Sequence, residues 1–413
     1  MNKPSNQIKF NRNFWAFTWH SFWLALAQTF ADRNTVLPGL ILLVGGTKME
    51  LGILTSILIG VPIFAQLLFA AFLSRKRLKK FFLLIGIYLR VFAFGGVVWT
   101  LSLANEVTSW TIILLVYFWM ILFTVSGAFA GVSYTDVLGK SIKGDTRKKF
   151  FVVRQFFSSL GILISALAVR QILHSFNYPK NYELAFSLAA VLLFVAALGF
   201  IAIKETPTKI VDEHFTFIQL VKSIPKVFRR DKNLKYFIII SNLVGFSFTV
   251  MPFYIALAKE RYHLNEQLIG NFLLFQILGM ILSNFVWNFI VKKYSFKGML
   301  KATIIIEGLL PLIAIIFSNY FPIEFYSILF FFTGSAISAH KISFGGMLLE
   351  ISTETNRALY TGIYGALSLT VAFFPLLIGP LINVLNYNAL FIVLGLLIFT
   401  SLVFVRRINC NTV

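Results

Sequence analysis

The sequence predicts an all-α membrane protein with twelve transmembrane helices. Its 413 residues are 58% hydrophobic and 13% charged, whereas about 25% of the residues of an ordinary soluble domain are charged. Apolar runs of roughly 20 residues recur from end to end, and each is long enough to cross a hydrocarbon core of about 30 Å as a helix. Runs such as LAAVLLFVAALGFIAI do not alternate in polarity as transmembrane β-strands would.

The expected helices follow the apolar runs in chain order, and polar or basic connections separate them. We place them at residues 14–43, 51–74, 81–103, 110–139, 151–175, 182–203, 236–258, 267–291, 299–318, 324–349, 361–383 and 388–405.

The positive charges of the connections set the orientation of these helices. Of the 37 Lys and Arg residues, 29 lie in the two termini and in alternate connections, four lie in the other connections, and four lie inside the runs. This imbalance is the positive-inside pattern and puts both termini in the cytoplasm. The formal net charge of +21 therefore reports topology, and we expect a lipid bilayer and no nucleic acid as partner.

We expect the first run to direct membrane insertion and not to be a signal peptide. The start MNKPSNQIKFNRNFW is too polar for a signal-peptide core, and the run that follows is too long for one. Cys410 is the only cysteine, which excludes an intrachain disulfide and a cysteine metal cluster. We expect no cofactor and no metal site.

The longest polar stretch divides the helices six and six. We therefore expect an N-terminal six-helix bundle at 1–203, a cytoplasmic linker at 204–235 and a C-terminal six-helix bundle at 236–413.

Part of the linker has an apolar stripe. Phe215, Ile218, Val221 and Ile224 recur at helical spacing among basic residues. The stripe fits an amphipathic helix on the cytoplasmic membrane surface or a solvated linker with some helix.

The two halves look alike when the numbering is shifted by 217. Arg75 and Lys76 then fall on Lys292 and Lys293, and Arg90 in the third run falls on a carboxylate, Glu307, in the ninth. Weak symmetry between two six-helix halves is typical of transporters.

With these features the chain resembles the major facilitator superfamily. In the second connection it reads AAFLSRKRLKK, where that family carries Gly-x-x-x-Asp-Arg-x-Gly-Arg-Arg-Lys. Arg75, Lys79 and Lys80 match the pattern, and Ser74 stands in place of the aspartate. The junctions YTDVLGKSIKGDTRKKFFVVRQ and LLEISTETNRALYTGIYGAL are similar to those of a little-characterised bacterial branch.

The resemblance implies a secondary transporter that works by alternating access, and not an enzyme. The chain has no nucleotide-binding Gly-x-x-x-x-Gly-Lys-Ser/Thr loop. The Gly-Pro-rich motif of drug/proton antiporters is absent from the fifth run, which disfavours that alternative without removing it. A lipid or glycolipid flippase on the same fold is the other alternative.

Asp32 is the acid that we expect at the central cavity. Small and polar residues recur through the first run in steps of four and three: Ser21, Ala25, Gln28, Asp32, Thr35 and Gly39. Such a stripe faces the bundle interior, and intramembrane acids often face a wet cavity. Because desolvation favours the protonated form of a carboxylic acid, Asp32 is the expected proton-coupling site. The open alternative is a structural ion pair, with Arg170 as partner.

Two cations are expected to face the same cavity. Lys341 lies on a stripe with Gly334, Ser338 and Gly345 in the tenth run, and Arg33 adjoins Asp32. Either one would bind an anionic group or serve as a structural cation. His340 lies off the stripe, as a packing residue or a proton relay.

The remaining candidates fall into two sets. Substrate-binding candidates with uncharged polar side chains are Gln28, Gln66, Thr124, Asn242, Thr249, Gln276 and Tyr364. Gating or structural ion-pair candidates are Arg90, Asp136, Arg147, Arg170, Glu307, Glu350 and Arg357.

Four intramembrane cations against two anions favour an anionic or zwitterionic small organic solute. We expect a multi-pass, monomeric, proton-coupled transporter of a bacterial cytoplasmic membrane.

Overall fold

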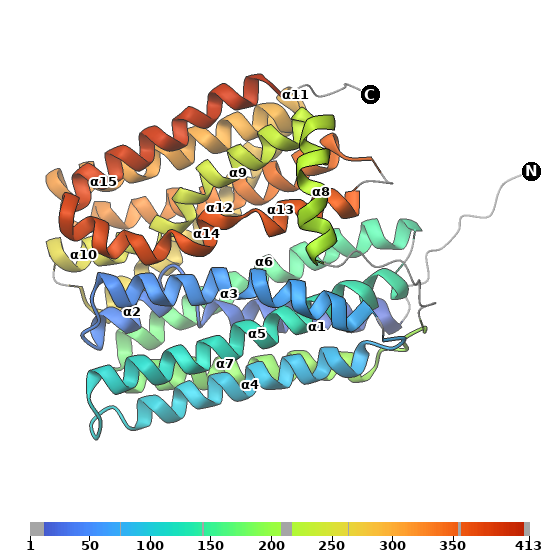
Figure 1. Cartoon of the computed structure of the whole chain (residues 1–413). Coiled ribbons are helices and arrows are strands. Elements are labelled where there is room, and N and C mark those ends of the chain that lie inside the picture. The colour runs from blue at the N-terminus through green and yellow to red at the C-terminus, as the bar shows by residue number, and fades with distance from the viewer. Residues whose placement is uncertain are drawn as a thin grey trace, which may run out of the picture.

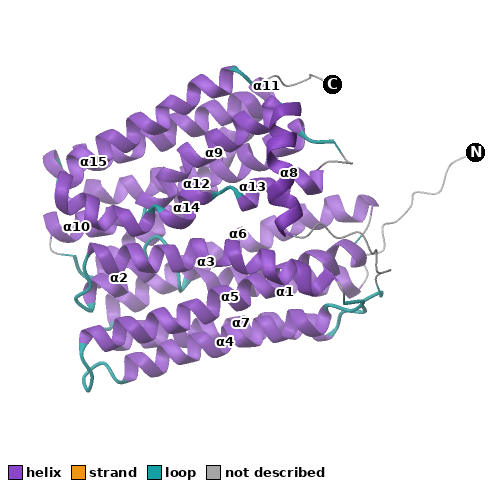
Figure 2. Cartoon of the chain, in the orientation of Figure 1, coloured by secondary structure: helices purple, strands orange, loops and turns teal. Residues whose placement is uncertain are grey.

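The computed structural model describes residues 12–74, 76–142, 144–207, 217–262, 264–353 and 357–408. Within these ranges the chain is helical and contains no strand (Figure 2). The helices form two groups, and both termini lie at the same end of the molecule (Figure 1). We call that end the terminus side and the opposite end the far side. The predicted all-α fold is confirmed.

The N-terminal half consists of seven helices that make six crossings. They are α1 (Arg12–Thr29), α2 (Val36–Leu43), α3 (Lys48–Ser74), α4 (Lys80–Ser102), α5 (Ser109–Ser141), α6 (Gly144–Ser175) and α7 (Lys180–Ile201). α1 and α2 together make the first crossing, because the chain leaves helical geometry between Thr29 and Val36. The prediction of one continuous helix over 14–43 is therefore wrong.

The C-terminal half also makes six crossings. Its helices are α9 (Lys232–Val250), α10 (Phe253–Tyr262), α11 (Glu266–Tyr320), α12 (Ile323–Ile351), α13 (Arg357–Ala366), α14 (Leu369–Phe373) and α15 (Pro375–Arg406). α11 holds two crossings, because Ser295 has φ 60° and ψ −177° and reverses the chain. Asn386, with φ 59° and ψ 169°, does the same in α15.

Eight segments of the described residues are long and apolar enough to cross a membrane by length and composition. The pair α1–α2 is not among them, since neither piece alone is long enough and apolar enough. α12 is also not among them, and its sequence TGSAISAHKIS is rich in small polar residues. The two crossings outside these eight segments are therefore the ones that carry Asp32, Arg33 and Lys341.

The break in the first crossing has a counterpart in the seventh. α9 ends at Val250 and α10 begins at Phe253. The shift of 217 maps residue 34, inside the first break, onto residue 251, inside the second (34 + 217 = 251). The two halves thus interrupt corresponding crossings at corresponding depths.

One further helix, α8 (Phe217–Arg230), lies in the stretch between the halves. It runs across the terminus side of the C-terminal half (Figure 1). Ile224, Val227 and Phe228 pack against the apolar cluster that contains Leu234 and Phe237. The described part of the apolar stripe therefore packs on protein. Of the rest of the stripe, Phe215 and the side chains of Ile218 and Val221 lie outside the described part of the chain.

Two glycines bring α12 against the first crossing of α11. A Cβ atom on Gly334 would lie 1.8 Å from the carbonyl oxygen of Gln276, and one on Gly279 would lie 1.9 Å from that of Phe331. Small residues allow such close approach between membrane helices. The contact fixes the position of the polar residues that follow on α12.

The two halves contact each other closely on the far side. A Cβ atom on Gly52 would lie 2.4 Å from the carbonyl oxygen of Pro375, and one on Gly379 would lie 2.7 Å from that of Lys48. An ion pair also joins Lys48 to Glu260. These contacts link α3 to α15 and α10.

No polar contact between the halves occurs toward the terminus side among the described residues. The hydrogen bonds and ion pairs that join the halves lie on the far side or at the break in the first crossing: Lys48–Glu260, Lys259–Leu42, Arg170–Asn271, Tyr178–Glu266 and Asp32–Gln276. The structure is therefore closed on the far side by contacts between the halves.

Replacing Gly334 by alanine is expected to destabilise the protein by about 1–3 kcal/mol, because the new methyl group overlaps backbone of α11. Thermal unfolding in detergent measures the effect. Gly345→Ala on the same helix is the matched control, since a Cβ atom there meets nothing within 4 Å, and it should leave the melting temperature unchanged or raise it. Equal melting temperatures of the two variants would contradict the close contact.

Gly52→Trp is expected to keep the far side open, because an indole cannot fit against Pro375. Spin labels on cysteines that replace Asn105 and Tyr320, in a chain carrying Cys410→Ser, should report a longer distance in the variant. Gly95→Trp is the control, because its Cβ position is open. The same distance distribution in both variants would disprove this closure.

Candidate functional site

Asp32 lies in the break between α1 and α2, three residues before the N-cap of the second helix, Thr35. Its Oδ1 accepts hydrogen bonds from the backbone N–H of Asn34 and Thr35 and from Thr35 Oγ1, each at 2.9 Å. The carboxylate thus provides partners for two backbone amides of the break, which would otherwise be buried without a hydrogen bond. The carboxylate therefore holds the break together, and the expected stripe on one continuous helix does not exist.

The other oxygen of Asp32 reaches the opposite half. Asp32 Oδ2 accepts from Gln276 Nε2 at 3.2 Å. Gln276, on α11, is 1% exposed, and its Oε1 has no partner among the described residues. Gln276 was expected to contact a ligand, and the structure gives it Asp32 as partner instead.

The alternative ion pair of Asp32 with Arg170 does not form. Arg170 Nε donates to Asn271 Oδ1 at 2.6 Å and joins α6 to α11 on the far side. Among the described residues, no cation lies within ion-pair distance of Asp32.

Two cations face open space near Asp32, one from each half. Arg33 and Lys341 are exposed and have no hydrogen bond or ion pair among the described residues. The charge of Lys341 interacts with the charges of both Arg33 and Asp32. Gln28, one turn before the break, is also exposed. These groups form the central site: Gln28, Asp32 and Arg33 of the N-terminal half, and Gln276 and Lys341 of the C-terminal half.

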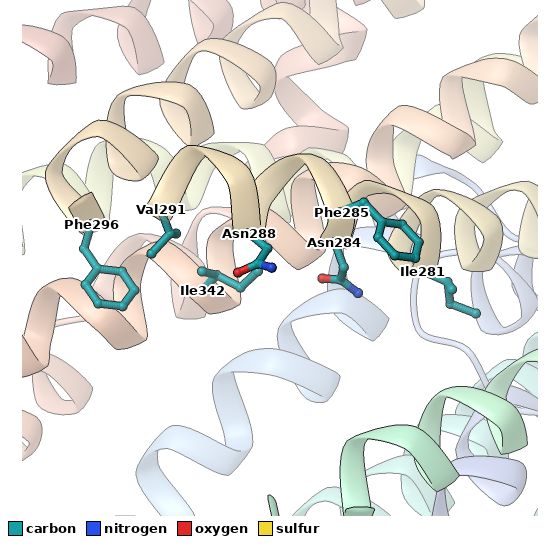
Figure 3. A pocket seen from close by; sticks show the side chains of 7 residues that line it. All are labelled: Ile281, Asn284, Phe285, Asn288, Val291, Phe296 and Ile342. Atoms are coloured by element: carbon teal, nitrogen blue, oxygen red, sulfur yellow. The ribbon is translucent and has the colours of Figure 1, made fainter. Parts of the chain in front are cut away.

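A cavity of about 560 Å³ lies along the first crossing of α11. It is lined by Ile281, Asn284, Phe285, Asn288, Val291, Phe296 and Ile342. In Figure 3 the two asparagine side chains extend from α11 into the same open space. Ile342 follows Lys341 directly on α12. The cavity thus has a mostly apolar wall, and Lys341 itself is not among its lining residues.

Asn284 is held in place by its neighbours. Its Oδ1 accepts from Ser338 at 2.6 Å, and its Nδ2 donates to the carbonyl oxygen of Met280 at 2.9 Å. Asn288 is exposed and has no hydrogen bond among the described residues. Sequence reasoning missed both asparagines, which sit one turn apart on the wall and were recognisable only as polar residues in an apolar run.

Four of the uncharged candidates have structural contacts. Thr124 donates to the carbonyl oxygen of Met120, and Thr249 donates to that of Phe246. Asn242 donates to the carbonyl oxygen of Leu367 and accepts from the backbone N–H of Thr370, which ties α9 to the broken eleventh crossing.

Tyr364, the fourth of them, is half-buried and packs its ring 5.3 Å from that of Phe237. Gln66 differs from these four, because it is exposed and has no hydrogen bond among the described residues.

Arg90 and Glu307, which the shift of 217 relates, have different surroundings. Arg90 is 8% exposed, and its guanidinium lies over the ring of Phe123 at 4.3 Å. Its partner is thus an aromatic ring, not the polar group that we expected. Glu307 is fully buried, and its Oε1 lies 3.1 Å from His340 Nδ1 on α12.

An ionic cluster covers the terminus side of the N-terminal half. Asp136 pairs with Lys79 at 2.9 Å and also with Lys140, and Lys140 lies 3.4 Å from Glu205. Glu205 also accepts the backbone N–H groups of Lys79 and Lys80, where α4 begins. Glu205 was not among the predicted residues.

The other predicted junction residues do not complete this cluster. Arg147 donates to the carbonyl oxygens of Ile142 and Gly139 and does not pair with Asp136. Glu350 is exposed, and the side chain of Arg357 lies outside the described part of the chain. No group of three or more His, Cys, Asp or Glu side chains suited to a metal ion occurs among the described residues.

Known proteins share features of this sequence and of this fold. The family model of the Major Facilitator Superfamily matches residues 22–282 and 236–409. A search of curated proteins found no match.

Solved structures resemble the whole chain. A POT family transporter in complex with 5-aminolevulinic acid is 13% identical, with a TM-score of 0.71 and 98% of each chain covered. An auto inhibited POT family peptide transporter is 12% identical, with a TM-score of 0.72 and coverage of 98% of this chain and 99% of that one. A mutant of the nucleoside transporter NupG is 12% identical, with a TM-score of 0.70 and coverage of 95% and 99%.

At these identities the structures show the fold alone. The family model spans nearly all of the described residues, and the chain therefore belongs to the major facilitator superfamily of secondary transporters.

Proposed function

We propose that the chain moves a small anionic or zwitterionic organic solute by alternating access. The observation that carries this proposal is the pair of cations Arg33 and Lys341, which face open space from opposite halves without a protein partner among the described residues. A charge that is left unpaired inside a membrane protein marks a ligand or ion pathway. An anion bound between them would be held by both halves at once.

The arrangement of the halves supports the transport step. Their polar contacts lie on the far side or at Asp32, so opening the far side requires the release of these contacts while the terminus sides approach. Rocking of two repeats around a fixed site is the expected motion. With the positive-inside assignment, the terminus side is cytoplasmic and the structure is inward-facing, in a bacterial cytoplasmic membrane.

Asp32 is the proposed coupling residue, because it takes part in the contact that links the halves at the central site. Hydrogen bonds to an ionised acceptor are roughly twice as strong as neutral ones. Protonation of Asp32 would therefore weaken its bond from Gln276 and ease separation of the halves. A proton could in this way promote the opening of the far side.

One structural neighbour supports the substrate class. The POT family transporter noted above was solved with 5-aminolevulinic acid, which is a zwitterion with a carboxylate. This compound is a suitable first probe for the present chain.

The apolar wall of the cavity favours a second candidate, a lipid or glycolipid flippase. Ile281, Phe285 and Phe296 would suit an acyl chain. Movement of a labelled lipid headgroup across the bilayer of proteoliposomes separates the two functions, because a carrier of soluble solutes leaves headgroups in their leaflet.

Lys341→Ala is expected to weaken binding of 5-aminolevulinate at least about tenfold, because a hydrogen bond to a charged group contributes about 1.5–3 kcal/mol. Thermal shift against ligand concentration measures the dissociation constant. Lys341→Arg should retain binding, and Lys293→Ala should behave as wild type, because Lys293 lies near the chain reversal at Ser295. Equal affinities in Lys341→Ala and Lys293→Ala would refute an anion site at Lys341.

Asp32→Asn is expected to abolish proton-driven accumulation and to retain exchange of labelled for unlabelled solute. The amide still accepts the hydrogen bonds at the break but cannot be protonated. Both rates are measured in proteoliposomes with an imposed pH gradient. Undiminished accumulation against a concentration gradient in this variant would rule out Asp32 as the coupling site.

A further inference from the structure

The C-terminal half contains a second intramembrane acid that the proposed mechanism does not use. Glu307 is the most deeply buried acidic residue among the described residues, with an exposed fraction of 0%. Its Oε1 contacts His340 Nδ1, and its Oε2 has no partner among the described residues. An ionised carboxylate in such surroundings is costly unless a neighbour balances its charge.

Among the described residues, His340 is the only neighbour that can balance this charge. The groups that act on Glu307 from the surrounding helices are His340 of α12, Tyr254 of α10 and Tyr364 of α13. From α9, the ring of Phe248 packs 4.4 Å from the His340 ring. No lysine or arginine among the described residues acts on Glu307. The carboxyl group and the imidazole therefore form one hydrogen-bonded pair.

His340 is the more exposed member of the pair. Its side chain is 18% exposed, and that of Glu307 is 0% exposed. The ring is fixed by stacking on Phe344 at 4.0 Å. The next residue on α12, Lys341, is exposed at the central site. A proton from water thus meets the imidazole before it meets the carboxyl group.

We propose that Glu307 and His340 form a proton-binding site within the C-terminal half, separate from Asp32 and loaded through His340. A proton from water bonds to the outer ring nitrogen, Nε2. The Nδ1–H bond then breaks as the Glu307 O–H bond forms, so the imidazole stays neutral. The net charge of the pair changes from one negative to none, and no electrons are transferred.

The role of this site in transport rests on the proton-coupled transport proposed above. Proton binding by the pair itself does not depend on that proposal. Its charge change occurs beside α10, which is the outer half of the broken seventh crossing. The shift of 217 relates α10 to α2 of the first crossing, and Asp32 lies in the break that precedes α2. Each half would then hold one proton-sensitive acid next to its broken crossing.

The test is infrared difference spectroscopy of the purified full-length protein in lipid vesicles, recorded between acidic and alkaline pH. Wild type should show a C=O band of a protonated carboxylic acid that Glu307→Gln removes and Asp32→Asn keeps. His340→Gln should shift its frequency or its pH midpoint. His20→Gln is the matched control, because His20 is a buried histidine bonded to the carbonyl oxygen of Ala196, and it should keep the band unchanged.

A spectrum of Glu307→Gln that equals wild type would overturn the proposal. If that variant does not fold, the His340→Gln spectrum decides: an unchanged frequency and midpoint also overturn it.

Solute accumulation in the same vesicles separates this site from the coupling role of Asp32. Loss of the band in Glu307→Gln together with normal accumulation in Asp32→Asn supports this site and rules out the coupling role of Asp32. A retained band in Glu307→Gln together with lost accumulation in Asp32→Asn overturns this site and supports the coupling role of Asp32.

Discussion

The bonds of the Asp32 carboxylate hold together the part of the structure on which the central site depends. A break in a membrane-crossing helix exposes backbone N–H groups that lipid cannot satisfy. Asp32 Oδ1 takes two of these groups and the hydroxyl of Thr35, and Oδ2 takes the amide of Gln276. The carboxylate stabilises the break by accepting these hydrogen bonds. Arg33, the next residue in the break, is exposed.

Close backbone contacts place the opposite wall of the site. Gly279 and Gly334 let α11 and α12 approach so closely that a single methyl group at either position would overlap backbone. The contact also positions Lys341, Asn284 and Asn288, since they lie one to three turns farther along the same helices. At the interface between the halves, Gly52 and Gly379 likewise allow close backbone contact, which closes the far side. Close helix contacts at glycines thus determine both the position of the site residues and the closure of the far side.

The two intramembrane acids differ in how they are held. Asp32 is partly exposed and accepts bonds from three residues, including two backbone amides. Glu307 is buried and, among the described residues, its side chain bonds only to His340. The partners of Asp32 are amides and a hydroxyl, whereas the partner of Glu307 is an imidazole. The two acids thus differ both in burial and in the chemistry of the groups that bond to them.

The amino-acid sequence by itself determined the membrane class, the twelve crossings and the division into two similar halves, because hydropathy and loop charge are local properties that survive in any packing. It also indicated Asp32, Arg33 and Lys341, since charges are rare in apolar runs. Only the tertiary structure decided that the first crossing is broken at Asp32, that Gln276 is its partner, and that Glu307 pairs with His340. Those facts depend on which helices approach one another, and residues 33 or 244 positions apart in the chain meet only after the helices have packed.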